Sequence, residues 1–99
     1  MITGPQCRAG RALVEITRGQ LAARSRVDEL IIEQFERNIE LPGPNAITSI
    51  QKALEELGAV FIAENGGGVG VRLKFSKSEA RRISRLEGEG GIVASDDVP

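Results

Sequence analysis

The stretch from Thr17 to Asn38, TRGQLAARSRVDELIIEQFERN, decides the fold of this chain. Thr17 and Gln20 have the spacing of a capping box, which predicts a helix of about eight residues. Val27 then fills a tight turn, and Asp28 begins a second helix as its N-cap. We therefore expect two short helices that are joined by a turn and end before Asn38.

The two faces of the second helix differ in character. Ile32 and Phe35 follow helical spacing and are expected to face inward, and Asn38 suits the left-handed residue that ends a helix. The acids on this helix are Asp28, Glu29, Glu33 and Glu36, against the single arginine Arg37. Any function proposed for the chain has to accommodate an acidic outer face.

Capping signals place two further helices around this pair. Thr3 and Gln6 form another capping box, with Pro5 in the first turn, and predict a helix near the N-terminus. Its expected core residues are Cys7, Ala12, Leu13 and Ile16. A fourth helix is expected from about Pro44 to Leu57. Its apolar stripe comprises Ile47, Ile50, Leu54 and Leu57.

The pattern changes to that of β-structure after Gly58, which ends the fourth helix. The segments Ala59–Ile62 and Val71–Phe75 are β-prone, and Asn65–Gly68 between them indicates a hairpin connection. The whole chain is therefore predicted to be mainly α. We expect a compact four-helix unit at 1–58, a β-hairpin with a short basic C-terminal helix (76–86) at 59–87, and a flexible acidic tail at 88–99.

The composition limits the chemistry. The 99 residues fit one small domain with 40 % apolar and 27 % charged residues, and no apolar run is long enough to span a membrane. There is no histidine, and Cys7 is the single cysteine, so histidine catalysis and thiolate zinc sites are excluded. We expect no enzyme activity, no cofactor and no metal, and a reducing cytoplasm as the compartment.

The net charge of −1 hides an uneven distribution. Residues 1–26 contain five arginines and one glutamate, a net +4, whereas residues 27–64 carry −6. Residues 70–86 then carry +5 and the tail from 87 carries −4. Two basic zones are therefore available for binding polyanions despite the near-neutral total.

The helical part resembles the Cro/repressor-type, or xenobiotic-response-element (XRE), helix-turn-helix family over about residues 5–58. The positions that carry the resemblance are Cys7, Arg11, Ile16, Thr17, Leu21, Ala22, Val27, Ile32, Phe35, Glu36 and Gly58. It implies a lambda-repressor-like domain in which Arg11 pairs with Glu36. The hairpin and its ENGGG segment also look like those of small bacterial regulators in this family.

Under this resemblance Asp28–Arg37 is the recognition helix, which enters the major groove of DNA. Its groove-facing positions are Glu29, Leu30, Ile31, Glu33 and Gln34. Gln34 is then suited to read adenine, and Glu33 to accept a hydrogen bond from cytosine. Leu30 or Ile31 is suited to contact thymine methyl groups.

Phosphate contacts are implied at the start of the preceding helix. Thr17 and Arg18 are expected to meet a phosphate there, helped by the helix N-terminus. Further phosphate candidates are Arg24, Arg26 and Arg37.

The chain departs from the family pattern in its turn and in the following loop. Arg26 stands where the family usually has glycine or a small residue, and the loop Ile39–Leu41 is acidic and apolar where the family is often basic. Acids on the recognition helix repel phosphates. Leu30 and Ile31 equally fit packing under a loop or a protein-binding face.

Several other segments have two interpretations. The glycines at 66–70 resemble a phosphate-binding loop, but a strand follows them instead of a helix, which favours a hairpin turn. The basic run of Lys77, Arg81, Arg82 and Arg85 is either a solvated face or a surface for DNA or an acidic partner. Cys7 is interpreted as a small buried apolar residue.

The resulting hypothesis is a bacterial, cytoplasmic transcriptional regulator that binds double-stranded DNA as a homodimer. The edge of Val71–Phe75 is the candidate dimer element. The alternative is a helix-turn-helix domain that acts as a protein-binding modulator, antiactivator or antitoxin-like, with little DNA affinity of its own.

Overall fold

The structure is a computed structural model that describes residues 1–75. These residues form α1 (Gly4–Val14), α2 (Arg18–Ser25), α3 (Glu29–Glu36) and α4 (Pro44–Glu56), followed by β1 (Ala59–Ile62) and β2 (Gly70–Leu73). The expectation of a mainly helical fold with four helices and a small hairpin is confirmed for this part of the chain. The expected C-terminal helix and the acidic tail lie outside the described residues.

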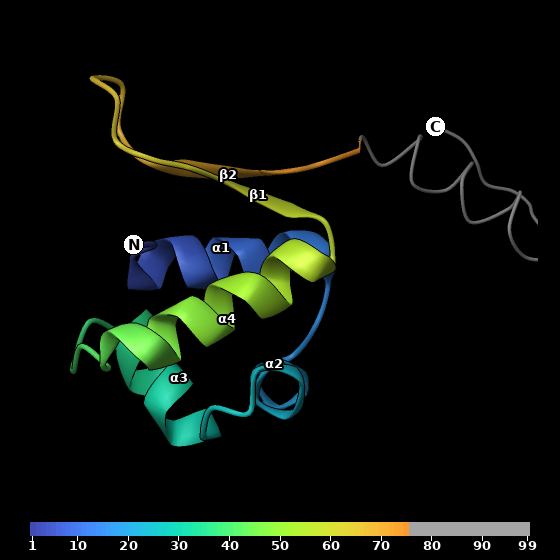
Figure 1. Ribbon diagram of the computed structural model, residues 1–99, viewed down its shortest axis with the longest axis vertical. Coiled ribbons are helices and arrows are strands. Elements are labelled where there is room, and N and C mark those ends of the chain that lie inside the picture. Colours follow the sequence, from blue (N-terminus) through green and yellow to red (C-terminus); the bar gives the residue numbers. More distant parts are fainter. Residues whose placement is uncertain (76–99) are drawn as a thin grey trace, which may run out of the picture.

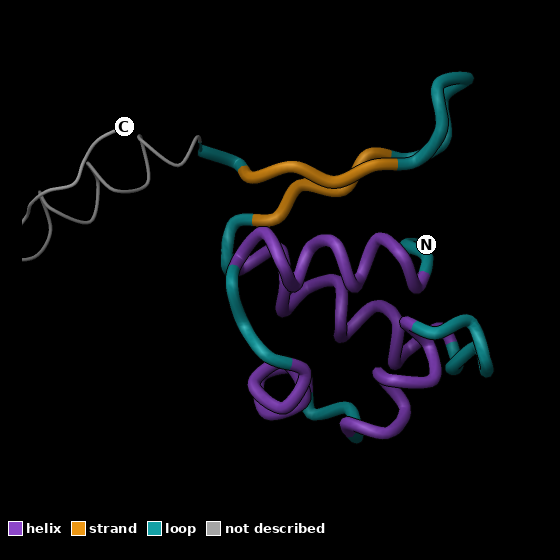
Figure 2. The backbone as a smooth tube through the Cα atoms, turned by 180° about the vertical axis from the view of Figure 1, so that it is seen from behind, coloured by secondary structure: helices purple, strands orange, loops and turns teal. Residues whose placement is uncertain are grey.

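The elements stack in layers. The hairpin lies on α1 and α4, and α2 and α3 lie on the other side of these two helices (Figure 1). The view from behind shows the same order, with the hairpin and the α2–α3 pair at opposite ends (Figure 2). The acidic α3 therefore faces away from the basic strand β2.

The helix starts predicted from capping signals are confirmed. The Thr3 hydroxyl accepts from the Gln6 N–H at 3.2 Å, and the Thr17 hydroxyl accepts from the Gln20 N–H at 3.0 Å. The Asp28 carboxylate accepts from the Leu30 N–H and caps α3. Each contact satisfies an amide that the helix itself leaves without a partner.

The core lies between the four helices and beneath the hairpin. Its buried apolar residues are Ile2, Cys7, Leu21, Val27, Ile32, Phe35, Ile47, Ile50, Ala53, Leu54 and Ala59. Val27 fills the α2–α3 turn as expected, and Ile16 packs at the margin. Leu57, expected in the α4 stripe, is the half-buried cap that follows this helix.

The predicted core face of α1 is wrong for Ala12 and Leu13, both of which are exposed. The face that packs instead includes Gly4 and Gly10. A Cβ on Gly10 would lie 3.1 Å from the Phe61 ring, and one on Gly4 would collide with the Phe35 carbonyl oxygen. Because these two glycines permit close packing, α1 turns a face of small residues inward rather than its most apolar one.

The hairpin is antiparallel and short. Ala59 pairs with Leu73 and Ile62 with Gly70, and the Lys74 N–H donates to the Gly58 carbonyl at 2.7 Å. The second strand was expected at Val71–Phe75, but β2 begins at Gly70 and ends at Leu73. The bond between Lys74 and Gly58 continues the pairing one residue beyond the end of β2.

The glycine-rich connection is a hairpin turn, as expected. The Glu64 carboxylate accepts from the N–H groups of Gly66 and Gly68, and the Asn65 side chain accepts from the Gly67 N–H. These three glycine amides are therefore all bonded by side chains of the turn itself.

Gln6 fastens the hairpin to the helices. Its side-chain NH₂ donates to the Ile62 carbonyl at 3.2 Å and to the Gly70 carbonyl at 2.9 Å, while its oxygen accepts from the Thr3 N–H. A lone two-stranded hairpin is marginal in water, so this buried carboxamide, together with Phe61 and Val71 packed on the core, holds the hairpin in place.

Candidate nucleic-acid interface

A buried carboxylate joins the first three helices. Glu36, at the end of α3, has a side chain that is 1 % exposed. Arg11 on α1 donates to both of its oxygens, at 2.8 and 2.9 Å, and Arg18 on α2 approaches at 3.4 Å. The Cys7 thiol donates to the same carboxylate at 3.2 Å. The bidentate pair fixes the orientation of α3 against α1.

The electrostatics of this cluster favour one protonation state. Burial alone would raise the pKa of Glu36, but hydrogen bonds from Arg11 and Cys7 and the charges of Arg11 and Arg18 lower it below its usual value. Burial and the adjacent Glu36 raise the pKa of the Cys7 thiol. The cluster therefore holds an ionised carboxylate beside a protonated thiol.

Two expectations are confirmed at this cluster and two contacts are additional. The pairing of Arg11 with Glu36 and the burial of Cys7 were both expected. The thiol hydrogen bond and the approach of Arg18 were not, because neither follows from helix spacing. Arg18, with 35 % of its side chain exposed, has one end at Glu36 and remains open to solvent.

The outer face of α3 carries three of the expected base-reading side chains and one of the expected phosphate contacts. Leu30, Glu33, Gln34 and Arg37 follow the i, i+3, i+4, i+7 spacing of one helix face. Leu30 is 57 % exposed. Glu33 and Arg37 form an ion pair at 3.0 Å, so the arginine on this face is already neutralised by a neighbour.

Glu29 and Ile31 flank that outer face. The Glu29 carboxylate lies beside the first turn of α2, since a Cβ on Gly19 would be 3.5 Å from it. A carboxylate is favourable near a helix N-terminus, and there it occupies space that an anion would need. Ile31 is 39 % exposed and turns toward the opposite edge.

The first turn of α2 brings Thr17 and Arg18 next to α3. The Thr17 hydroxyl oxygen already accepts the Gln20 N–H as the cap of α2. It can therefore bind an anion only by donating its own O–H. Arg18 lies between this turn and Glu36. Arg18 therefore contacts the end of α3, while Arg26 lies two residues before Asp28, the residue that caps its start.

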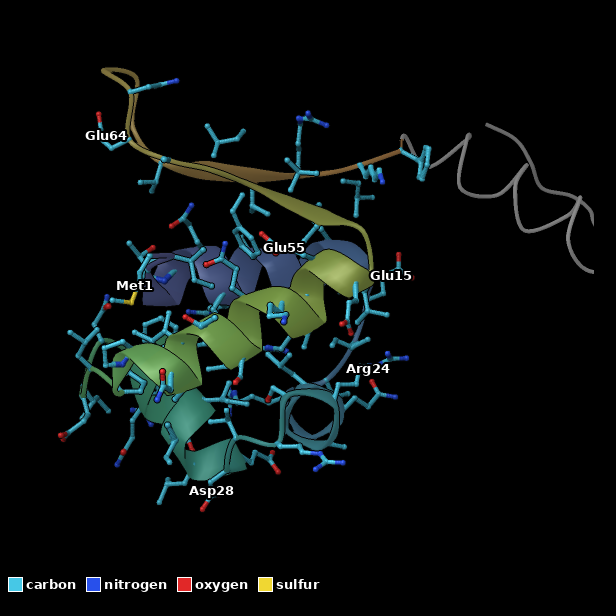
Figure 3. All side chains as sticks on the ribbon, in the orientation of Figure 1. Met1, Glu15, Arg24, Asp28, Glu55 and Glu64 are labelled. Atoms are coloured by element: carbon cyan, nitrogen blue, oxygen red, sulfur yellow. The ribbon has the colours of Figure 1, made fainter. Side chains whose placement is uncertain are left out.

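Arg24 and Arg26 are both exposed but differ in backbone conformation. Arg24 extends from α2 on the side away from Asp28 (Figure 3). Arg26 follows α2 in the left-handed conformation, with φ 61°, and its N–H donates to the Ala22 carbonyl. The turn therefore has the backbone conformation that glycine adopts without strain, but Arg26 occupies the strained position.

The structure gathers Thr17, Arg18, Glu29, Leu30, Glu33, Gln34 and Arg37 on the surface formed by the start of α2 and the outer face of α3, here called the α2–α3 surface. Ile31 lies at its margin, and Arg24 and Arg26 lie at the far end of α2. Sequence reasoning did not detect that Glu29 faces α2 or that Glu33 pairs with Arg37. The i, i+4 spacing of Glu33 and Arg37 is the signal that was available.

The sequence matches no model of a known protein family and no curated protein. Within residues 1–75, no helix is both long and apolar enough to cross a membrane. The same residues contain no group of three or more His, Cys, Asp or Glu side chains arranged to hold a metal ion.

Proposed function

We propose that this chain is a lambda-repressor-like, sequence-specific regulator that binds double-stranded DNA through the α2–α3 surface as a bacterial homodimer. The proposal rests on a contrast within α3. The end of this helix is held in place by a buried ion pair, whereas its outer side is accessible to a ligand. Glu36 fixes the end of this helix against α1 and α2. Leu30 and Arg37 are exposed, and Glu33 and Gln34 are half-buried on the same side of the helix.

Major-groove recognition requires a rigid helix that offers side chains of this kind. Gln34 is suited to a bidentate contact with adenine, and Leu30 to a thymine methyl group. The phosphate backbone is assigned to Thr17 and Arg18 at the start of α2. The Glu33–Arg37 pair opens on binding, which leaves Arg37 for a phosphate and Glu33 for a cytosine.

The test is selection of duplexes from a random library by the full chain, followed by binding titrations at several salt concentrations. We expect a preferred site bound at least about a thousandfold more tightly than random DNA, with affinity falling steeply as salt rises. Affinity that stays in the weak nonspecific range for every selected duplex would refute the proposal.

Two substitutions assign the contacts. Gln34→Ala should relax preference at one base pair by about 1–3 kcal/mol. Arg18→Ala should weaken all duplexes alike and reduce the salt slope by about 1. Arg24→Ala is the matched control for Arg18, because it removes an exposed arginine from the far end of the same helix.

A second function is favoured by a different property of the same surface. Leu30 is 57 % and Ile31 39 % exposed, and three of the four acids of this region, Asp28, Glu29 and Glu33, lie outside the core. An acidic face with two exposed aliphatic residues suits a basic, apolar patch on a protein. Under this alternative the chain is a protein-binding modulator, and Leu30→Ala should abolish partner binding while DNA affinity is negligible throughout.

A further inference from the structure

The free edge of β2 has an uncovered apolar helix face beneath it. Among the described residues β2 pairs only with β1, so its other edge has no partner. The Lys74 N–H points toward β1, and by strand alternation the peptide groups of Val71 and Leu73 point outward. Such an edge is a template for another strand.

The apolar face beneath this edge belongs to α1. Gln6 and Gly10 touch the hairpin, and Leu13 continues the same helix line but is 38 % exposed. Ala9 lies beside that line and is also exposed. Pro5 and Ala12 complete a stripe of small and apolar residues on the outer side of α1, here called the α1 stripe, and the exposed Arg8 borders it on the side of α3.

The edge of β1 does not lie over an apolar helix face of this kind. β1 lies over α4 as well as α1, whereas β2 lies over α1. The outer side of α4 carries Lys52, Glu55 and Glu56, and Glu55 sits just below the hairpin (Figure 3). An approaching copy would have to cover charges on the β1 side and apolar groups on the β2 side. The β2 side is therefore the favourable one.

We propose that a second copy of this chain docks along β2, so that the two hairpins form one four-stranded antiparallel sheet with the two α1 stripes facing each other beneath it. This inference rests on the proposed function for its biological meaning but not for its test. Strands lie about 4.8 Å apart and packed helices 8–10 Å apart, so four strands leave room for two helices below them.

The symmetry of this arrangement suits the proposed function. A strand that pairs antiparallel with its own copy has a two-fold axis perpendicular to the sheet. Both helical layers then lie on the same face of the sheet. Because α3 lies on the side of α1 and α4 opposite the hairpin, both copies of α3 face the same way, as two half-sites on one side of a duplex require.

The charges on β2 select the register. If the axis passed through Arg72 or Leu73, it would bring Arg72 opposite Arg72 or Lys74 of the second copy, which is unfavourable. An axis at Val71 brings Val71 opposite Val71, Arg72 opposite Gly70, and Leu73 opposite the exposed Val69. We therefore place the axis at Val71.

The first test is the mass of the full chain in solution, measured without DNA by sedimentation equilibrium. We expect about twice the 10.6 kDa chain mass at roughly 50 μM. Leu13→Glu should weaken the dimer at least about tenfold. Leu30→Glu is the matched control, since it charges an exposed leucine on α3 and should leave the mass unchanged. A monomer, in which the edge is free or covered within the chain, overturns the proposal.

The second test is cysteine crosslinking, for which the buried Cys7 gives little background. Opposed residues in the expected register have Cα atoms about 5.5 Å apart, so Val71→Cys should form a covalent dimer on mild oxidation. Residues 72 of the two copies would be diagonal neighbours at about 7–8 Å, beyond easy bridging. Arg72→Cys is therefore the control, and crosslinking as fast through it overturns the proposal.

These tests separate the dimer from the function. A dimer with the expected crosslink but no sequence-selective DNA binding refutes the proposed function and supports this interface. A monomer that still selects one DNA sequence does the reverse.

Discussion

Glu36 and Glu33 are three residues apart on α3, and the surroundings of these two carboxylates differ in kind. Glu36 is buried and receives hydrogen bonds from residues on α1 and α2. Among the described residues Glu33 forms one ion pair, with the exposed Arg37 that directly follows α3. The inner face of α3 is thus fixed by several elements at once, whereas its outer face is free to vary with the ligand. The difference separates what makes the fold from what a partner would bind.

The largest effect is expected on the inner face. Glu36→Gln keeps the shape but removes the charge, which leaves the guanidinium of Arg11, 17 % exposed, without its anion. We expect a loss of about 3 kcal/mol in the free energy of unfolding, measured by urea denaturation at pH 7. Glu33→Gln should change it by less than about 0.5 kcal/mol, because an exposed pair contributes little. Equal losses for both would contradict the comparison.

Acid should reproduce part of that loss. The pKa of Glu36 is lower in the folded chain than in the unfolded one, since Arg11, Cys7 and Arg18 together outweigh burial. Its contribution is therefore present above the ordinary glutamate pKa, about 4.3, and is lost as pH falls below it. Urea midpoints between pH 7 and pH 3 should fall for the natural chain. The fall should be shallower in Glu36→Gln, and identical slopes would remove Glu36 as the cause.

The turn between the two helices should respond in the opposite direction. Arg26 has φ 61°, where glycine is unstrained. Arg26→Gly should raise the free energy of unfolding by about 0.5–1 kcal/mol, after the entropy that glycine adds to the unfolded chain. Arg24→Gly, inside α2, should lower it by a similar amount. A destabilised Arg26→Gly variant would show that the Arg26 side chain makes a contact that outweighs the backbone strain.

The helices and their ends were predictable because each has a local signal. Thr3 and Thr17 each form a capping box with the glutamine three residues ahead, and Asn38 ends the segment of α3 with a positive φ. The face of α1 was not predictable in the same way. It depends on Gly10 lying under Phe61, which is 51 positions away in the chain, and no periodicity of apolar residues contains that contact.

The contacts of the candidate site also divide into those that the sequence predicts and those that depend on tertiary structure. The pairing of Arg11 with Glu36 was predictable from the family resemblance, and it is present. The second role of Gln6, which caps α1 and also binds both strands of the hairpin, depends on tertiary structure. The same is true of Glu29, whose position beside α2 follows from the angle between two helices and not from its place in α3.

The smallest effect is expected at Glu29, on the boundary between the two faces. Its carboxylate lies beside the first turn of α2, where the proposed phosphate contact forms, so it competes with DNA for the helix N-terminus. Glu29→Gln should raise affinity for the selected duplex about two- to threefold and steepen the salt dependence. Glu55→Gln removes the same charge next to the hairpin, and fluorescence anisotropy should show a smaller gain for it. Equal gains would mean that only net charge matters, whereas a loss of affinity confined to Glu29→Gln would make this carboxylate a base-reading group.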